Sequence, residues 1–97
     1  MIEVKLSQGA KPGHGGVLPK AKVSQEIADA RGVPMGQDCV SPARHSAFSS
    51  PIELLNFVAR LRALSGGKPV GIKLCVGQPA EWFSVVKAML ATGLTPD

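Results

Sequence analysis

The hydrophobic positions follow two different periods along the chain, and these periods predict strands and helices in turn. Residues 2–6 alternate between apolar and polar side chains and predict a short strand. Apolar residues recur at helical spacing over residues 51–64 and again from Ala80 to about Ala91, which predicts two helices with one buried stripe each. The second stripe contains Trp82 and Phe83, so we expect these two aromatic rings to lie in the core.

The residues that flank the helical segments match the usual start and stop signals. Ser24 is suited to cap a short helix over residues 25–31, and Gly32 is suited to end it. Ser50 followed by Pro51 predicts the start of the first long helix.

Two further segments predict strands. Residues 69–76 are apolar with almost no polar alternation, which is typical of a strand covered on both faces, and Cys39–Val40 could form a short buried strand. The order strand, helix, strand, helix, strand, helix predicts a parallel α/β unit that spans residues 1–97. Lys73 interrupts the apolar run, so its ammonium must either emerge at the strand end or meet an anion.

The loop that follows the first strand is rich in glycine and proline and carries the polar side chains of Gln8, Lys11 and His14. Glycines let a ligand approach the main chain closely. In α/β proteins, such a loop at the end of a strand is a frequent place for an anionic ligand. A solvated connection between two elements is the alternative interpretation.

Composition limits the class of protein. The chain has 97 residues, of which 44% are hydrophobic and 19% charged, with a net charge of +4, as expected of a globular domain with anionic ligands. The lysines are scattered, so we expect no nucleic-acid partner, and no apolar run approaches the roughly 18 residues of a membrane span. Cys39 and Cys75 stand far apart and no export signal precedes them, which predicts reduced thiols and a cytoplasmic location.

Several catalytic motifs are missing. Lys11 precedes the glycine pair, which excludes a P-loop, and Leu18 occupies the third glycine position of a dinucleotide fingerprint. His14 and His45 have no partner at a zinc-ligand spacing, and we expect both to act as hydrogen bonders in loops.

A family resemblance covers nearly the whole chain. The runs KLSQGAKPGHGG, LPKAKVSQEIADARG, GQDCVSPARHSAFSSPIELL and GGKPVGIKLCVG resemble the synthase domain of FMN-dependent glutamate synthases, in their compact bacterial and archaeal form. The resemblance implies a (β/α)8 barrel that joins ammonia to 2-oxoglutarate and reduces the imine with reduced flavin. A complete barrel needs about 250 residues, so the chain resembles a fragment with about three consecutive strand–helix units, inactive on its own.

The resemblance assigns flavin contacts to Lys73, Lys5 and Gln8. In such barrels, a strand lysine lies against the flavin edge where negative charge appears on reduction, and it stabilises that charge. FMN is therefore implied for the full-length enzyme. An iron–sulfur cluster is possible there too, although this segment contains no ligands for one and no other metal site.

The resemblance also assigns the chemistry of the substrate. Lys11 and Gln8 match the catalytic lysine and glutamine that face flavin and 2-oxoglutarate, and Lys11, Arg31 and Ser50 match residues that bind the oxoacid. A guanidinium fork suits a carboxylate. Ser50 has a structural explanation as a helix cap as well.

Two positions differ from the large glutaminase-linked enzymes, which have glutamine where this chain has Val17 and glutamate where it has Ile52. These differences leave the nitrogen donor and the exact oxoacid open. A non-catalytic anion-binding or assembly module derived from the barrel, or a truncated product without a function, are the alternatives. As partners we expect an oxoacid similar to 2-oxoglutarate and either a second copy or the remainder of the barrel.

Overall fold

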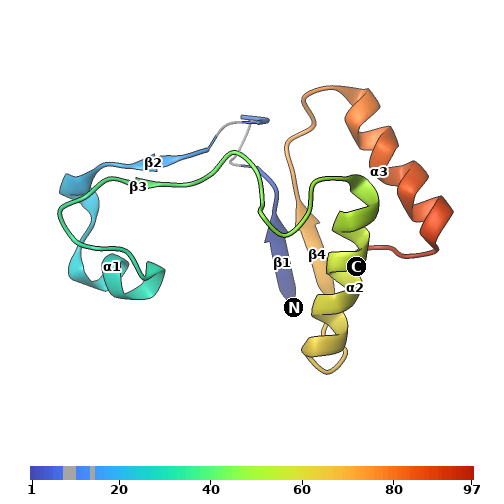
Figure 1. Ribbon diagram of the computed structural model, residues 1–97, viewed down its shortest axis with the longest axis horizontal. Coiled ribbons are helices and arrows are strands. Elements are labelled where there is room, and N and C mark those ends of the chain that lie inside the picture. The colour runs from blue at the N-terminus through green and yellow to red at the C-terminus, as the bar shows by residue number, and fades with distance from the viewer. Residues whose placement is uncertain (8–10, 14) are drawn as a thin grey trace.

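The computed structural model describes residues 1–7, 11–13 and 15–97. The chain forms a body and a smaller lobe that is inserted between the first strand and the first long helix (Figure 1). The body contains β1 (Ile2–Lys5), α2 (Pro51–Leu64), β4 (Val70–Lys73) and α3 (Pro79–Thr92). The lobe contains β2 (Val17–Leu18), the 3₁₀ helix η1 (Lys20–Lys22), α1 (Gln25–Arg31) and β3 (Cys39–Val40).

The body is built on a parallel pair of strands, as the sequence predicts. β1 pairs with β4 in a register that runs from Ile2 opposite Val70 to Lys5 opposite Lys73. Because alternate residues of a strand point to opposite faces, Val4 and Val70 share one face, and they form a buried cluster with Leu54 and Val58 of α2. α3 packs against α2, so the two helices form a layer on one side of the strands (Figure 1).

The other face of the strand pair differs from the prediction. We expected the segment 69–76 to be covered on both faces, but β4 ends at Lys73, and Glu3, Lys5 and Lys73 are exposed on the face away from α2. Only two strands pair in parallel within the described residues, and no second helical layer covers them there. Lys73 therefore emerges at the strand end, which is one of the two alternatives that its sequence position left open.

The structure of the lobe differs from the predicted third strand–helix unit. Cys39–Val40 does form a strand, but it pairs antiparallel with Val17–Leu18 and does not join the parallel sheet. Val40 is 68% exposed, so the strand is not buried. A pairing of two residues per strand is too short to bury their side chains, and β2 and β3 lie far apart in sequence. The parallel part of the described chain therefore contains two strand–helix units and not three.

The short helix of the lobe agrees with its predicted signals. The Ser24 hydroxyl accepts a hydrogen bond from the Ile27 amide (3.3 Å), and Gly32 ends the helix in the left-handed region at φ 64°. Val23 and Ala28 are buried within the lobe, apart from the main core cluster.

The N-terminus of α2 is capped from both directions. The Ser50 hydroxyl accepts from the Glu53 amide (3.2 Å), and the Glu53 carboxylate accepts from the Ser49 amide (2.6 Å) and hydroxyl (2.8 Å). These bonds satisfy donors that a helix start leaves unpaired, so the predicted start at Ser50–Pro51 is confirmed. Among the described residues, no helix has the length and apolar character needed to cross a bilayer.

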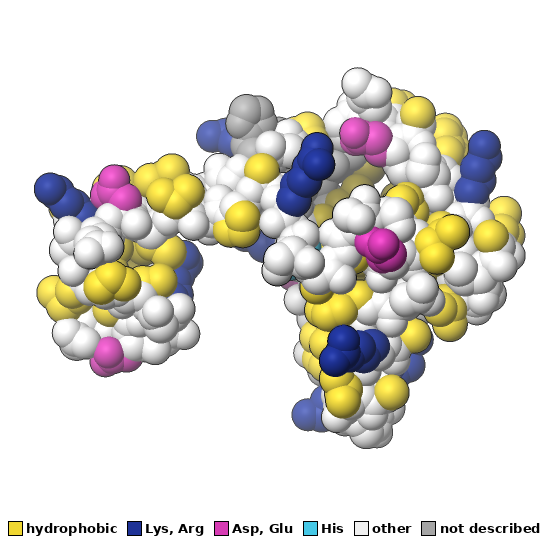
Figure 2. Space-filling model, viewed as in Figure 1, with side chains coloured by type: hydrophobic (Ala, Val, Ile, Leu, Met, Phe, Trp, Pro, Cys, Tyr) yellow, Lys and Arg dark blue, Asp and Glu magenta, His cyan; other side chains and the backbone are white. Residues whose placement is uncertain are grey.

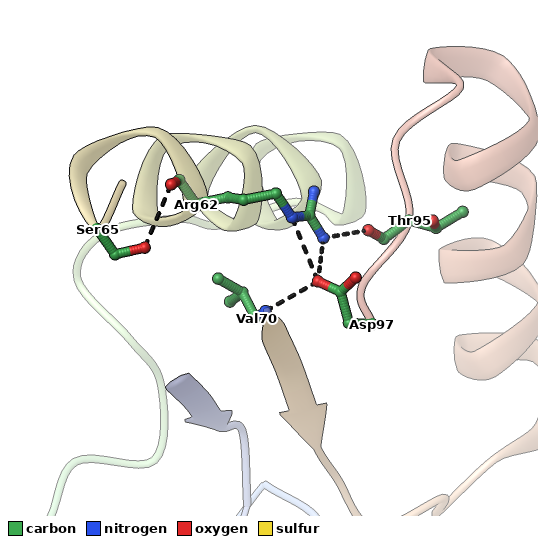
Figure 3. Close-up of polar contacts among 5 residues, drawn as sticks. All are labelled: Arg62, Ser65, Val70, Thr95 and Asp97. Carbon is green, nitrogen blue, oxygen red and sulfur yellow. Dashed lines mark hydrogen bonds and ion pairs between the residues drawn. The ribbon is translucent and has the colours of Figure 1, made fainter. Parts of the chain in front are cut away.

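The far end of the chain returns to the start of β4 (Figure 3). Asp97 donates its amide to the Val70 carbonyl (2.9 Å) and accepts from the Val70 amide (2.8 Å). Arg62 of α2 donates to the same carboxylate from Nε (3.2 Å) and to the Thr95 carbonyl (2.9 Å). The hydrogen bond from Arg62, followed by that from Val70, lowers the pKa of Asp97 below its ordinary value. This contact fixes the last residues against both β4 and α2.

Candidate functional site

Three hollows open around the carboxyl ends of β1 and β4, and Leu6 lines all of them. Parallel α/β sheets bind their ligands at this end of the strands, because the connecting loops meet there. The candidate site is therefore formed by the loops that follow β1, β3 and β4.

The first hollow, here called the cationic cleft, lies between the lobe and the body and has a volume of about 270 Å³. Its lining includes three cations from three separate segments and no aspartate or glutamate: Lys5, Leu6, Ser7, Arg31, Ser41, Pro42, Ala43, Arg44 and His45. Like charges that converge on one hollow favour an anionic occupant.

A larger cleft of about 580 Å³ adjoins the first between the amino ends of α2 and α3. It is mostly apolar and contains one carboxylate, that of Glu81, and its lining comprises Leu6, Ala43, Arg44, His45, Phe48, Ser49, Ser50, Pro51, Leu54, Glu81, Ser84 and Val85. A third hollow of about 180 Å³ lies between the loops that follow β1 and β4 and includes Cys75 and Trp82.

His45 holds the loop between β3 and α2 in place. Its Nε2 donates to the Lys5 carbonyl (2.7 Å), which lies at the end of β1. The imidazole stacks on Phe48 with 5.0 Å between the ring centroids, and Phe48 in turn lies 5.5 Å from Phe57 of α2. The prediction that His45 is a hydrogen bonder in a loop is thus confirmed. This anchor also fixes the backbone of its neighbour Arg44 beside the strand end.

The loops around the clefts approach each other closely at two glycines. A Cβ on Gly15 would lie 1.9 Å from the Ser41 carbonyl oxygen, and a Cβ on Gly77 would lie 2.8 Å from Cγ of Pro12. The Ser7 hydroxyl accepts from the Cys75 amide (2.7 Å), which joins the loop after β1 to the loop after β4. Gly15 therefore leaves no room for a side chain against the Ser41 backbone, and a Cβ on Gly77 would crowd the Pro12 ring.

The structure brings together some of the predicted site residues. Lys5 and Arg31 line the cationic cleft, and Lys73 lies beside Lys5 in the strand register. The Arg31 guanidinium donates to the thiol of Cys39 (3.8 Å). Ser50 lines the larger cleft, with its hydroxyl engaged in the helix cap.

Other predicted residues lie outside this group. Lys11 is exposed on the loop after β1 and lines none of the three hollows. Gln8 and His14 lie outside the described residues, so their predicted roles stay predictions.

Arg44 was not singled out by the sequence analysis, although it lines both the cationic and the larger cleft. In the sequence, Arg44 is marked as a candidate site residue only by its place in a loop between a predicted strand and a capped helix. A single arginine in such a loop is usually solvated, so this signal is weak.

The described residues contain no group of histidine, cysteine, aspartate and glutamate side chains that could hold a metal ion. On the face shown in Figure 2, lysine and arginine side chains are scattered over the lobe and the body and form no continuous basic stripe.

Comparison with known proteins identifies the family. Residues 1–93 match the family model described as the conserved region in glutamate synthase. The glutamate synthase large subunit-like protein YerD of Bacillus subtilis is 47% identical over 96 residues, which cover 99% of this chain and 18% of that protein. The archaeal glutamate synthase (NADPH) of Methanocaldococcus jannaschii is 46% identical over 85 residues, which cover 87% of this chain and 17% of that protein.

An archaeal-type glutamate synthase (NADPH) of Thermotoga maritima is 42% identical over 74 residues, or 75% of this chain and 15% of that protein. The chain thus spans less than one fifth of the length of these relatives. The residues that match the family model, 1–93, include both strand–helix units, the inserted lobe and the cationic cleft. The chain therefore belongs to the glutamate synthase family, of which it represents a partial segment.

Proposed function

We propose that this segment supplies part of the oxoacid-binding and flavin-binding surface of an FMN-dependent glutamate synthase. The complete enzyme would form glutamate from 2-oxoglutarate and ammonia by reduction of an imine. The observation that carries the proposal is the cationic cleft, which lies at the carboxyl end of two parallel strands next to the Lys5–Lys73 pair.

The composition of the cleft supports an oxoacid as ligand. Lys5, Arg31 and Arg44 surround a hollow of about 270 Å³, slightly below the range of about 300–1,000 Å³ that is usual for ligand pockets. A whole dinucleotide does not fit such a volume, whereas a small organic acid does. Guanidinium groups bind carboxylates through two parallel hydrogen bonds, so the donor set suits this class of ligand.

The residues beside the cleft also suit a flavin. Lys5 and Lys73 face each other in the register and lie on the same exposed side of the strand pair, away from α2. Two ammonium groups at that point stabilise an anionic group laid against the strand ends. FMN, when bound, supplies the reducing equivalents for the imine. Lys73 then stabilises the negative charge, while Lys11 and Gln8 remain the proposed catalytic residues on the adjacent loop.

We propose that the two strand–helix units belong to a (β/α)8 barrel in the cytoplasm, because their strands are parallel and their helices lie on one side. The names of the relatives from Methanocaldococcus jannaschii and Thermotoga maritima specify NADPH, so we propose NADPH as the source of electrons. The isolated chain should be inactive, because it spans less than one fifth of the length of these relatives.

The direct test is an assay of the full-length protein that contains this segment, loaded with FMN and supplied with 2-oxoglutarate, ammonium and NADPH. We expect glutamate to form at the rate at which NADPH is consumed, and formation to stop when either 2-oxoglutarate or ammonium is omitted. Oxidation of NADPH without any glutamate would overturn the proposal. Binding of 2-oxoglutarate without turnover would instead favour a non-catalytic anion-binding module.

A further inference from the structure

We propose that Arg44 determines substrate specificity: it binds the distal carboxylate of a dicarboxylic oxoacid, while Arg31 binds the carboxylate next to the oxo group. This inference rests on the proposed function, since it concerns the same cleft. It adds a residue that the family resemblance did not point to, and it assigns the two guanidinium groups to opposite ends of the ligand.

The guanidinium groups of Arg44 and Arg31 have few competing partners within the described part of the chain. Within the described part of the chain, the one ion pair joins Arg62 to Asp97, and the Arg44 guanidinium has neither a hydrogen bond nor an ion pair. Arg31 donates to a thiol, which is a weak acceptor, so its guanidinium keeps most of its hydrogen-bonding capacity. Both groups are therefore available for a ligand.

Arg31 and Arg44 come from different segments of the chain. Arg31 ends α1 and belongs to the lobe, whereas Arg44 belongs to the loop that His45 anchors to the end of β1. Both side chains line the cationic cleft, but they enter it from different segments. Two guanidinium groups on separate supports can each bind one carboxylate of the same ligand.

The surroundings of Arg44 decide which end of the ligand each guanidinium group binds. Arg44 also lines the larger cleft beside α2 and α3, whereas Lys73 lies on the opposite face of the strands, where we place the flavin. The oxo carbon must face the flavin, so the distal carboxylate extends towards the helices and Arg44. A matched monocarboxylate lacks this group, and the loss of one charge-assisted hydrogen bond weakens binding by about ten- to a hundredfold.

The test compares 2-oxoglutarate with 2-oxopentanoate, which has a methyl group in place of the distal carboxylate. Isothermal titration of the full-length protein that contains this segment, loaded with FMN, should show that the unmodified protein binds 2-oxoglutarate about ten- to a hundredfold more tightly than 2-oxopentanoate. Arg44→Gln should weaken only 2-oxoglutarate and remove most of this preference. Arg44→Lys keeps the charge but loses the planar fork, so it should retain an intermediate preference.

Arg60→Gln is the matched control, because Arg60 is exposed on α2 and lines none of the three hollows. It should leave both affinities unchanged, and thermal melts should confirm that all variants are folded. An unchanged preference in Arg44→Gln would overturn this inference and leave the proposed oxoacid site intact. If the unmodified protein binds inorganic phosphate as tightly as 2-oxoglutarate, the cleft is a general anion site and the inference is wrong. Failure to bind either oxoacid would refute the inference and the proposed oxoacid site together.

Discussion

At the residue scale, Lys73 and Arg31 are proposed to bind different ligands, Lys73 the flavin and Arg31 the oxoacid. Lys73 lies beside Lys5 on the open face, and it lines none of the three hollows, whereas Arg31 lines the cationic cleft. This separation predicts that the electronic properties of the flavin and the affinity for the oxoacid can be changed independently.

We predict that Lys73→Met in the complete flavoenzyme lowers the reduction potential of the flavin and slows its reduction. The removed ammonium no longer stabilises the negative charge of the reduced flavin, while the oxoacid site keeps its cations. Redox potentiometry measures the first effect, and the KM for 2-oxoglutarate should stay nearly constant. Lys68→Met, which removes an exposed lysine just before β4, is the matched control. A potential that is unchanged in Lys73→Met would return Lys73 to a structural role.

Residue-level prediction from sequence succeeded for His45 and failed for the two aromatic rings of α3. His45 was expected to be a hydrogen bonder in a loop, and it contacts the Lys5 carbonyl. Trp82 and Phe83 were expected in the core, but they are 37% and 59% exposed, so that expectation was wrong. Helical periodicity shows that residues share a face, but it does not show whether another element covers that face. Arg44 was not predicted as a site residue for a similar reason, since its place in the two clefts depends on segments that are distant in sequence.

At the element scale, the caps were the most predictable features, because their hydrogen bonds join residues three or four positions apart. The Ser49 amide and hydroxyl, in that order, lower the pKa of Glu53 below its ordinary value of 4.5. A carboxyl group with a lowered pKa in the folded state stabilises the protein above its ordinary pKa, and this stabilisation disappears as the pH falls through the lower folded value.

We therefore predict that Glu53→Gln lowers the melting temperature at pH 7, because the charge-assisted bonds to Ser49 are lost. The difference from the unmodified protein should shrink as the pH falls below about 4.5. Thermal melts across this pH range, followed by circular dichroism, provide the measurement. A difference that stays constant with pH would show that the charge of Glu53 contributes nothing to the cap.

The pairing of β2 with β3 was the least predictable element. Each strand has two residues, and the pairing depends on close contact between loops that are remote in sequence. Gly15 lies directly against the Ser41 carbonyl, and the Gly16 carbonyl accepts from the Ser41 amide (2.7 Å). The sequence shows a glycine-rich loop there but not what lies opposite each glycine.

We predict that Gly15→Ala destabilises the chain by about 1–3 kcal/mol, because the new methyl group forces the two loops apart. Gly71→Ala is the matched control: its Cβ would meet its nearest neighbours at 3.5 and 3.6 Å, which is ordinary contact. Urea denaturation of both variants tests the difference. Equal stability of the two variants would mean that the loops adjust without cost.

At the scale of the whole molecule, the body exposes apolar surface that an independent domain would bury. Phe83, Leu64 and Leu90 are 59%, 74% and 82% exposed, and the parallel sheet has two strands in the described part of the chain. Open strand edges and large apolar patches tend to recruit another chain. The α/β class with parallel strands was predictable from the alternation of strand and helix periods, whereas the number of units was not.

We predict that the isolated chain self-associates or is marginally soluble. Sedimentation velocity at several concentrations should show species larger than the monomer, and Phe83→Ser together with Leu90→Ser should reduce them. A stable monomer with a cooperative melt at high temperature would indicate an autonomous domain instead.

The central claim is that the cationic cleft binds the oxoacid, and the KM of an Arg31→Ala variant of the complete flavoenzyme tests it most directly. We predict that the KM for 2-oxoglutarate rises by about ten- to a hundredfold, because a charge-assisted hydrogen bond to a carboxylate is lost, while the flavin potential stays unchanged. A KM equal to that of the unmodified enzyme would contradict the assignment of the cleft.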